Sequence, residues 1–235
     1  MALATGFLKE MHGVLGDCVI AHRGKKVFIK KRPEKSKKPL TELAMAKKAR
    51  FGLAGKIAGK ISSIEDIKHF WKSDPEKNQT GYNRLFHANH GQFNKEDLSG
   101  KIVLSEGDGL EVLNPSIEIE EAGVHIKCDL FESVDVKKRE AAKYARAAGI
   151  IILKSPNLPG CADFEVMKFQ TKNCLIENGE EFSAEVKYLG GDGVKFLTFA
   201  IKKAFAVLIA VDGEMNLADI SKTFESETKR NDMLD

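Results

Sequence analysis

The residue types that most often carry chemistry are thinly spread along this chain of 235 residues. His87 and His90 stand three positions apart in a segment with helical spacing, so both imidazoles would share one helix face, as a metal site requires. His69 lies upstream, but no carboxylate or third ligand stands at a supporting spacing. The helix dipole alone also favours histidines near a helix C-terminus. We therefore predict no metal site and no cofactor.

Sequence motifs for catalysis are absent. The chain contains no GxSxG, no GxGxxG, no GxxxxGK[ST] and no EF-hand spacing. Residues 107–109 and 190–193 resemble phosphate or calcium loops only in composition, and turns between strands explain them better. The acidic pairs Glu120-Glu121 and Glu180-Glu181 stand beside glycine in predicted turns, where solvated charge is the usual meaning. We predict no catalytic residues and no enzymatic activity.

Charge is the strongest signal in the sequence. Residues 1–60 hold fifteen Lys or Arg and four Asp or Glu, whereas residues 61–235 hold 22 and 30. A basic head and an acidic body can attract each other between copies, and such a run of cations can also contact phosphate. The alternative is a solvated run that Pro33, Pro39 and like-charge repulsion keep unstructured. The candidate contacts with nucleic acid or an acidic partner are Lys25, Lys26, Lys30, Lys31, Arg32, Lys35, Lys37 and Lys38. Phe28 and Phe51 are too few aromatics for a base-stacking platform.

A β-hairpin is predicted within the basic head. Residues 18–21 and 26–29 are β-branched or aromatic runs, and Gly24 between them supplies the positive φ that a short hairpin loop needs. Gly13 and Gly16 bracket the entry, where the chain could approach another backbone closely. Because two strands alone are marginal in water, this hairpin must dock on the C-terminal domain or on a neighbouring copy.

A helix is predicted after Pro39, with Thr41 as its cap and apolar residues near helical spacing through Ile61. Gly55 and Gly59, with Ala54 and Ala58 beside them, would form a small-residue face that lets another element approach. The alternative is that the helix ends at Gly52. Together with the hairpin, this face defines a candidate assembly interface of Gly13, Gly16, Ile20, Phe28, Ile29, Gly52, Gly55 and Gly59.

The rest of the chain divides into a helical part and a β-rich part. Ser62 and Ser63 are predicted to cap a helix that stops before Asp74-Pro75, and residues 82–90 form a third helix with Gly91 at its end. From Leu98 the hydrophobic period becomes two. The predicted strands are residues 101–104, 110–112, 116–119, 124–128, 150–153, 164–169, 183–188, 195–201, 204–211 and 217–224.

These patterns predict an α+β fold, with an N-terminal β-hairpin and a small helical unit followed by an antiparallel β-sandwich. Residues 136–148 are either a helix, by propensity, or an exposed connection. The expected boundaries are 1–39 for the hairpin and basic arm, 40–97 for the helical unit, 98–224 for the sandwich and 225–235 for a frayed polar tail.

Composition places the chain among ordinary folded proteins, with 43% hydrophobic and 30% charged residues. No apolar run is long enough to span a bilayer, and the N-terminus does not read as a signal peptide. We therefore expect a cytoplasmic protein, or part of a particle assembled in the cytoplasm, and the alternative is export by a specialised route that needs no signal peptide. The four cysteines are widely spaced with no CxxC pair, which favours buried thiols over disulfides or zinc.

The order of these features resembles a group of uncharacterised proteins from Bacteroidetes-type bacteria. In that family a glycine-marked N-terminal hairpin and small helices precede a β-rich C-terminal domain. The resemblance is clearest over residues 6–90 and architectural beyond, and it implies this architecture without an established activity. The matching residues are Gly13, Gly16, Gly24, Lys25, Arg32-Pro33, Phe51-Gly52 and Asn83-Arg84-Leu85.

Taken together, these features favour a non-enzymatic structural subunit. Its copies would associate through the N-terminal hairpin arm into a filament, a phage-like or tail-like tube, or a virion-like particle. The alternative is a nucleic-acid-binding protein that uses the basic arm.

Overall fold

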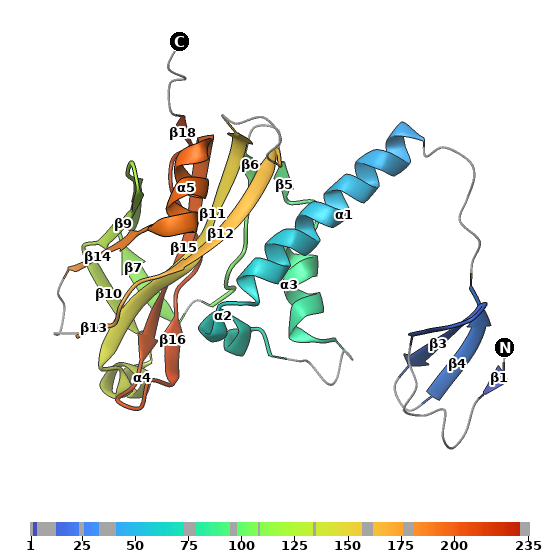
Figure 1. The fold of residues 1–235 in the computed structure, drawn as a ribbon. Coiled ribbons are helices and arrows are strands. Elements are labelled where there is room, and N and C mark those ends of the chain that lie inside the picture. The colour runs from blue at the N-terminus through green and yellow to red at the C-terminus, as the bar shows by residue number, and fades with distance from the viewer. Residues whose placement is uncertain are drawn as a thin grey trace, which may run out of the picture. The chain divides into compact units, whose positions relative to one another are not determined.

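The computed structural model describes residues 2–3, 13–23, 26–32, 41–72, 79–94, 98–107, 109–133, 135–156, 162–175 and 181–230 (Figure 1). The chain divides into two compact units, Met1–Met45 and Ala46–Asp235. Helix α1 (Glu42–Ile61) contains the boundary between them.

The N-terminal unit is a four-stranded antiparallel sheet. Its strands are β1 (Ala2–Leu3), β2 (Gly13–Leu15), β3 (Cys18–Arg23) and β4 (Lys26–Lys31), in the order β1-β4-β3-β2. The predicted hairpin is confirmed as β3 and β4, which pair from Cys18 with Lys31 to Arg23 with Lys26. Two further strands flank the hairpin, because β2 pairs with β3 and β1 with β4.

Two long strands form the centre of the second unit. β11 (Tyr144–Pro156) and β15 (Phe199–Val211) pair antiparallel along nearly their whole length. The strands β12 (Phe164–Gln170) and β13 (Cys174–Leu175) pair with β11, and β16 (Leu217–Ile220), β17 (Phe224–Glu225) and β18 (Lys229–Arg230) pair with β15. Both central strands are buried almost continuously, because both faces of this seven-stranded sheet are covered.

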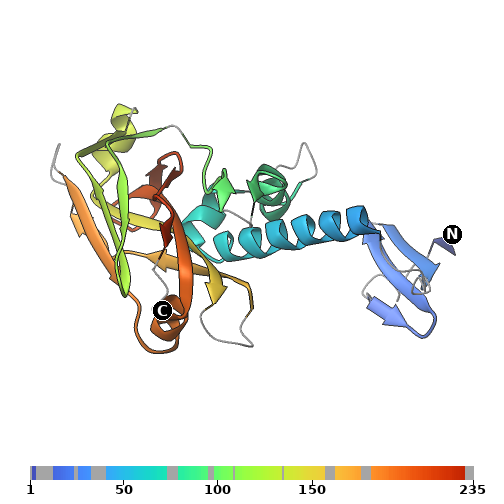
Figure 2. The same ribbon diagram turned by 90° about the horizontal axis from the view of Figure 1, so that it is seen from above.

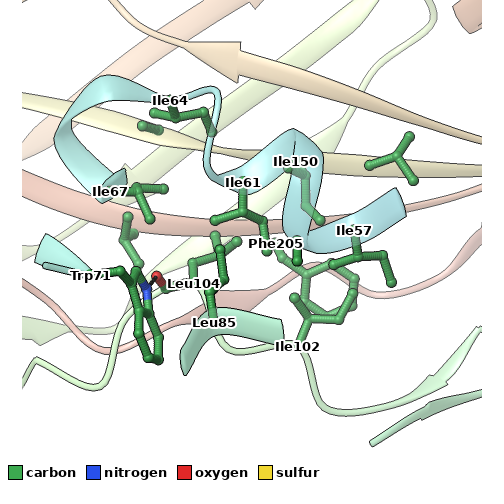
Figure 3. Packing of buried hydrophobic residues seen from close by; sticks show 14 of the residues in the cluster. Ile57, Ile61, Ile64, Ile67, Trp71, Leu85, Ile102, Leu104, Ile150 and Phe205 are labelled. Atoms are coloured by element: carbon green, nitrogen blue, oxygen red, sulfur yellow. Dashed lines mark hydrogen bonds between the residues drawn. The ribbon is translucent and has the colours of Figure 1, made fainter. Parts of the chain in front are cut away.

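Helices cover one face of this sheet: α1, α2 (Glu65–Phe70) and α3 (Gly81–Asn89). Ile57 and Ile61 of α1 pack with Ile150 of β11 and Phe205 of β15 (Figure 3). The buried Trp71 indole donates a hydrogen bond from Nε1 to the Leu104 carbonyl at 2.6 Å. This contact ties the end of α2 to residues 101–104, which follow the short strands β5 (Phe93–Asn94) and β6 (Ser99–Gly100).

Smaller sheets cover the opposite face. A three-stranded sheet has the order β14-β9-β8, with strands β8 (Ser116–Ile119), β9 (Gly123–Cys128) and β14 (Phe182–Lys187). Its inward side chains, such as Val124 and Ile126, pack against Ile151 and Leu208 of the central sheet. β7 (Leu110–Leu113) pairs with β10 (Leu130–Ser133). Figure 2 shows the central sheet between this layer and the helices, so the predicted α+β class with packed antiparallel sheets is confirmed.

Two local predictions were wrong, and one open alternative is resolved. Ser62 and Ser63 do not cap α2, since their hydroxyls donate to the carbonyls of Gly59 and Lys60 and so close the end of α1. Residues 136–148, for which a helix and an exposed connection were both considered, form the short helix α4 (Val136–Ala141) and then the start of β11, which includes residues 144–148. The strand expected over 195–201 is largely the helix α5 (Gly190–Thr198).

Two further segments differ from expectation. Residues 101–104 form no strand, because side chains take their backbone hydrogen bonds: Asn89 Oδ1 accepts from Val103 N and Thr223 Oγ1 from Leu104 N. Residues 225–230, expected to begin a frayed tail, include β17 and β18 and lie against β15. Among the described residues, no helix is both long and apolar enough to cross a membrane.

Candidate functional site

The hairpin residues of the predicted interface lie on both faces of the N-terminal sheet. Ile20 is directly opposite Ile29 in the register, whereas Phe28 is opposite Ala21, one residue along. Because side chains alternate across a strand, Ile20 and Ile29 share one face and Phe28 lies on the other. Ile20 is buried, and Phe28 and Ile29 are half-buried. The structure therefore brings two of these three residues together.

Gly13 and Gly16 allow the backbone to adopt conformations with positive φ. Their φ angles are 110° and 57°, values that side chains strongly disfavour. A Cβ built at either position would meet no described atom within 4 Å, so neither glycine is needed for a close approach inside the sheet. Gly16 lies in the turn that joins β2 to β3, and β2 is an edge strand. Val14 in the middle of β2 is 59% exposed.

The glycines of α1 do not end the helix, which continues to Ile61. Gly52, Gly55 and Gly59 stand three and four residues apart, which places them on one face of the helix, away from the buried Ile57 and Ile61. Within the described chain, Cβ atoms at Gly52 and Gly59 would meet nothing within 4 Å. At Gly55 the Tyr82 hydroxyl lies 3.8 Å from that position and donates to the Gly55 carbonyl at 3.4 Å. We call Gly52, Gly55 and Gly59 the glycine face.

The basic residues of the arm are only partly within the described chain. Lys26, Lys30, Lys31 and Arg32 lie on or directly after β4, whereas Lys25, Lys35, Lys37 and Lys38 lie outside the described residues. Lys30, Lys31 and Arg32 are exposed. Because strand side chains alternate, Lys30 and Lys31 point to opposite faces of the sheet, and the described part of the run does not form a single cationic stripe.

The histidine pair of α3 belongs to an aromatic group. The rings of Phe86 and His90 stack with centroids 5.4 Å apart, and Phe51 lies 4.8 Å from Phe86. His87 contacts the edge of the Phe86 ring at 5.8 Å. His69 lies 3.5 Å from Glu65 within α2. In the part of the chain that the structure describes, these histidines do not join any group of three metal-ligating side chains.

One such group does form elsewhere. Glu118, Glu120 and His125 each offer a ligand atom, and these atoms lie within 4.8 Å of one another. Sequence reasoning missed the group because only the β8–β9 register brings His125 beside Glu118. The sequence did contain one indication of this group. Ile117 and Ile119 alternate with Glu118 and Glu120, which places both carboxylates on one face of a strand.

Two buried polar side chains that contact Phe196 of α5, Tyr188 and Lys202, have no hydrogen-bond partner among the described residues. Lys202 on β15 is fully buried, and its Nζ lies 4.7 Å from the centre of the Phe196 ring. Burial, and secondarily the nearby Lys229, lowers the pKa of the Lys202 ammonium. The Tyr188 ring stacks on Phe196 at 5.0 Å, and burial raises the pKa of its hydroxyl.

Neither Lys202 nor Tyr188 lines a cavity formed by the described residues. A cavity of about 500 Å³ lies between residues 100–106 and 222–225, where Ser105, Glu106, Lys222 and Glu225 contribute polar atoms. Its volume would suit a small molecule. However, among its lining residues the Ser105 backbone amide already donates to Thr223 Oγ1, and this contact joins the two segments of the fold.

Comparisons with known proteins give no family. No family model matches this chain, and no curated protein matches it. An alkylpurine DNA glycosylase, AlkC, from Pseudomonas fluorescens is similar to 75% of this chain at 10% identity with a TM-score of 0.25. β-Glucosidase 3B from Thermotoga neapolitana is similar to 71% at 12% identity with a TM-score of 0.22. The matches cover 46% and 23% of those chains, and similarity this low supports no argument about fold or function.

Proposed function

We propose that this chain is a non-enzymatic structural subunit whose copies associate through the N-terminal arm, residues 1–39, into a filament, tube or particle. The observation that carries this proposal is the separate N-terminal sheet. Units of about 40 residues usually need a disulfide, a metal or a partner to be stable. Cys18 is a free thiol, and the described part of this unit holds no group of metal ligands. A surface that packs on this sheet is the remaining source of stability, and in this proposal another copy of the chain supplies it.

The open edge of the sheet supports the same proposal. Among the described strands, β2 lies at the end of this sheet, with the exposed Val14 at its centre. An edge strand offers unpaired backbone groups to a strand from another molecule, and this mode of association gains main-chain hydrogen bonds. The sheet of a second copy, or an edge strand such as β12 in its body, would satisfy those groups.

The glycine face provides a second surface for a close approach. Three glycines inside a helix each cost roughly 1 kcal/mol against alanine. Of these, only Gly55 contacts a neighbouring side chain within the described chain. A partner that packs directly on the α1 backbone would account for the cost of Gly52 and Gly59. The opposite charges of residues 1–60 and 61–235 would assist such contacts between copies at low salt.

The test compares the full chain with a chain that lacks residues 1–39, by sedimentation and electron microscopy at low and high salt. We expect regular assemblies from the full chain and monomers from the shortened chain. In the full chain, Val14→Lys places a charge on the β2 edge and should dissociate the assemblies. Val136→Lys is the matched control, since Val136 is 53% exposed on the body. Monomers of the unmodified chain at every salt concentration would exclude the proposal.

Nucleic-acid binding is the second candidate, supported by the exposed cations Lys30, Lys31 and Arg32. Neutralising phosphates releases counterions, so binding to DNA or RNA should weaken steeply as salt rises. Replacing the three cations with glutamine should reduce both the affinity and the slope of that salt dependence. Binding that is insensitive to salt, or to these substitutions, would count against this function.

A further inference from the structure

The outer face of the β14-β9-β8 sheet gathers side chains that suit a metal ion. Ile117 and Ile119 of β8 are buried toward the core, so Glu118 between them points outward. Glu118 is directly opposite His125 on β9. Glu120 follows two residues after Glu118, and its amide donates at 3.0 Å to the carbonyl of Gly123, the first residue of β9. The ligand atoms of Glu118, Glu120 and His125 therefore lie within 4.8 Å of one another.

A residue outside this group orients the imidazole. His125 Nε2 lies 2.9 Å from Ser183 Oγ on β14, the strand on the other side of β9. Histidines that bind metals characteristically have their second ring nitrogen held by a polar partner, which fixes the tautomer. In the tautomer whose Nε2–H donates to Ser183, the lone pair on Nδ1 is available to bind a cation.

From these relationships we propose that Glu118, Glu120 and His125 bind a divalent transition-metal ion, with Zn²⁺ as the representative ion. Two carboxylates balance its charge, and an imidazole nitrogen favours Zn²⁺ over Mg²⁺ or Ca²⁺, which take mainly oxygen ligands. Ligand atoms bound to one zinc at about 2.1 Å are roughly 3.4 Å apart in a tetrahedron. Rotation of the two exposed glutamate side chains closes the remaining distance. Three protein ligands leave a fourth position for water.

The same face carries a competitor for the ion. Lys127 Nζ lies 3.5 Å from Glu118 Oε2, on the same outward side of β9 as His125. An incoming cation must displace this ammonium from the carboxylate. Removing the ammonium therefore strengthens metal binding if Glu118 is a ligand, whereas it has no such effect on metal bound elsewhere.

The experiment titrates the full-length chain with Zn²⁺ by calorimetry, and with Co²⁺ by visible absorption, which reports the ligand geometry. We expect one site, weakened at least tenfold by His125→Ala or by Glu118→Gln with Glu120→Gln, and strengthened severalfold by Lys127→Met. His87→Ala with His90→Ala is the matched control for histidines outside the group and should change nothing. Circular dichroism checks that each variant stays folded.

The proposal fails if Zn²⁺ does not bind at millimolar concentration, if binding survives His125→Ala, or if Lys127→Met leaves the affinity unchanged. These readouts do not depend on the association state of the chain. The metal site can therefore fail while the proposed assembly stands, and the reverse also holds.

Discussion

Arg146 on β11 and Asp66 on α2 form a buried ion pair, with Nη2 and Oδ1 2.5 Å apart. Gln170 on β12 also donates to the second Asp66 oxygen at 3.1 Å, and Asn173 accepts from Arg146 Nη1 at 3.1 Å. The Arg146 and Asp66 side chains are only 13% and 11% exposed. This group of polar contacts fixes the short helix α2 to two strands of the central sheet.

Asp66→Asn should destabilise the second unit by about 3 kcal/mol, because Arg146 is left charged, buried and without its counter-ion. Urea denaturation followed by circular dichroism measures this change. Glu65→Gln is the control: Glu65 neighbours Asp66 but is exposed, and its contact with Lys68 lies within one helix. An equal effect of the two substitutions would show that the Arg146 pair does not hold α2.

Glycine positions in the second unit should respond in opposite ways to alanine. A Cβ at Gly149 on β11 would overlap the Phe205 carbonyl oxygen and lie 3.0 Å from Ala206 Cα, both on the rigid β15 backbone. Gly149→Ala should therefore cost about 3 kcal/mol or more. Gly59→Ala has open space within the described chain and should stabilise α1 by up to about 1 kcal/mol. Thermal denaturation of the two variants measures both changes in stability. A Gly149→Ala protein as stable as the unmodified chain would contradict the close packing of β11 against β15.

The buried thiol of Cys128 should make stability fall in alkali. Burial raises its pKa to about 11, above the unfolded value of about 8.5. The folded state keeps its proton where the unfolded state loses it, so this stabilising contribution is complete below pH 8.5. It is lost as pH rises from there through about 11. The difference between the denaturation midpoints at pH 8 and pH 10 should be smaller for Cys128→Ala than for the unmodified chain.

Lys202 should make the stability of the protein rise, not fall, with increasing pH over part of the same alkaline range. Because burial lowers its folded pKa, the unfolded chain binds the proton more readily, and the penalty is present below the unfolded value of about 10.4. Lys202→Met should then stabilise the protein at pH 7 by about 1–3 kcal/mol, as expected for removing an unsatisfied buried group. The gain should shrink as pH approaches 10.4. A destabilised Lys202→Met protein would mean that the contact between Lys202 and Phe196 outweighs the desolvation of the ammonium.

Much of the fold could be predicted because its signals are local. The alternation in residues 116–119 and 124–128 correctly indicated the strands β8 and β9. For residues 144–148 the sequence indicated only a helix or an exposed connection, because alanine favours helices, whereas Ala145 and Ala147 in fact lie in a strand and pack in a buried core. Tertiary packing decided that segment against its local propensity.

The candidate surfaces depend still more on long-range relationships. Helix α5 begins without a side-chain cap and contains three glycines, so nothing local predicts it; the burial of Phe196 accounts for it. The group of Glu118, Glu120 and His125 needs the register of two strands, and its orienting Ser183 comes from residues far along the chain. Lys30 and Lys31 are a similar case. That they point to opposite faces of the sheet follows only once the structure shows that β4 extends to Lys31.

The pairing of β11 with β15 has a consequence for how the chain folds. The two strands are joined by residues 157–198, so their pairing closes a long loop whose entropy is lost before either core is complete. Each strand contributes alternate side chains to both cores, with Ile150 in one and Ile151 in the other. Neither core can therefore form ahead of the other. We expect slow refolding of the second unit, with both cores appearing in a single kinetic phase.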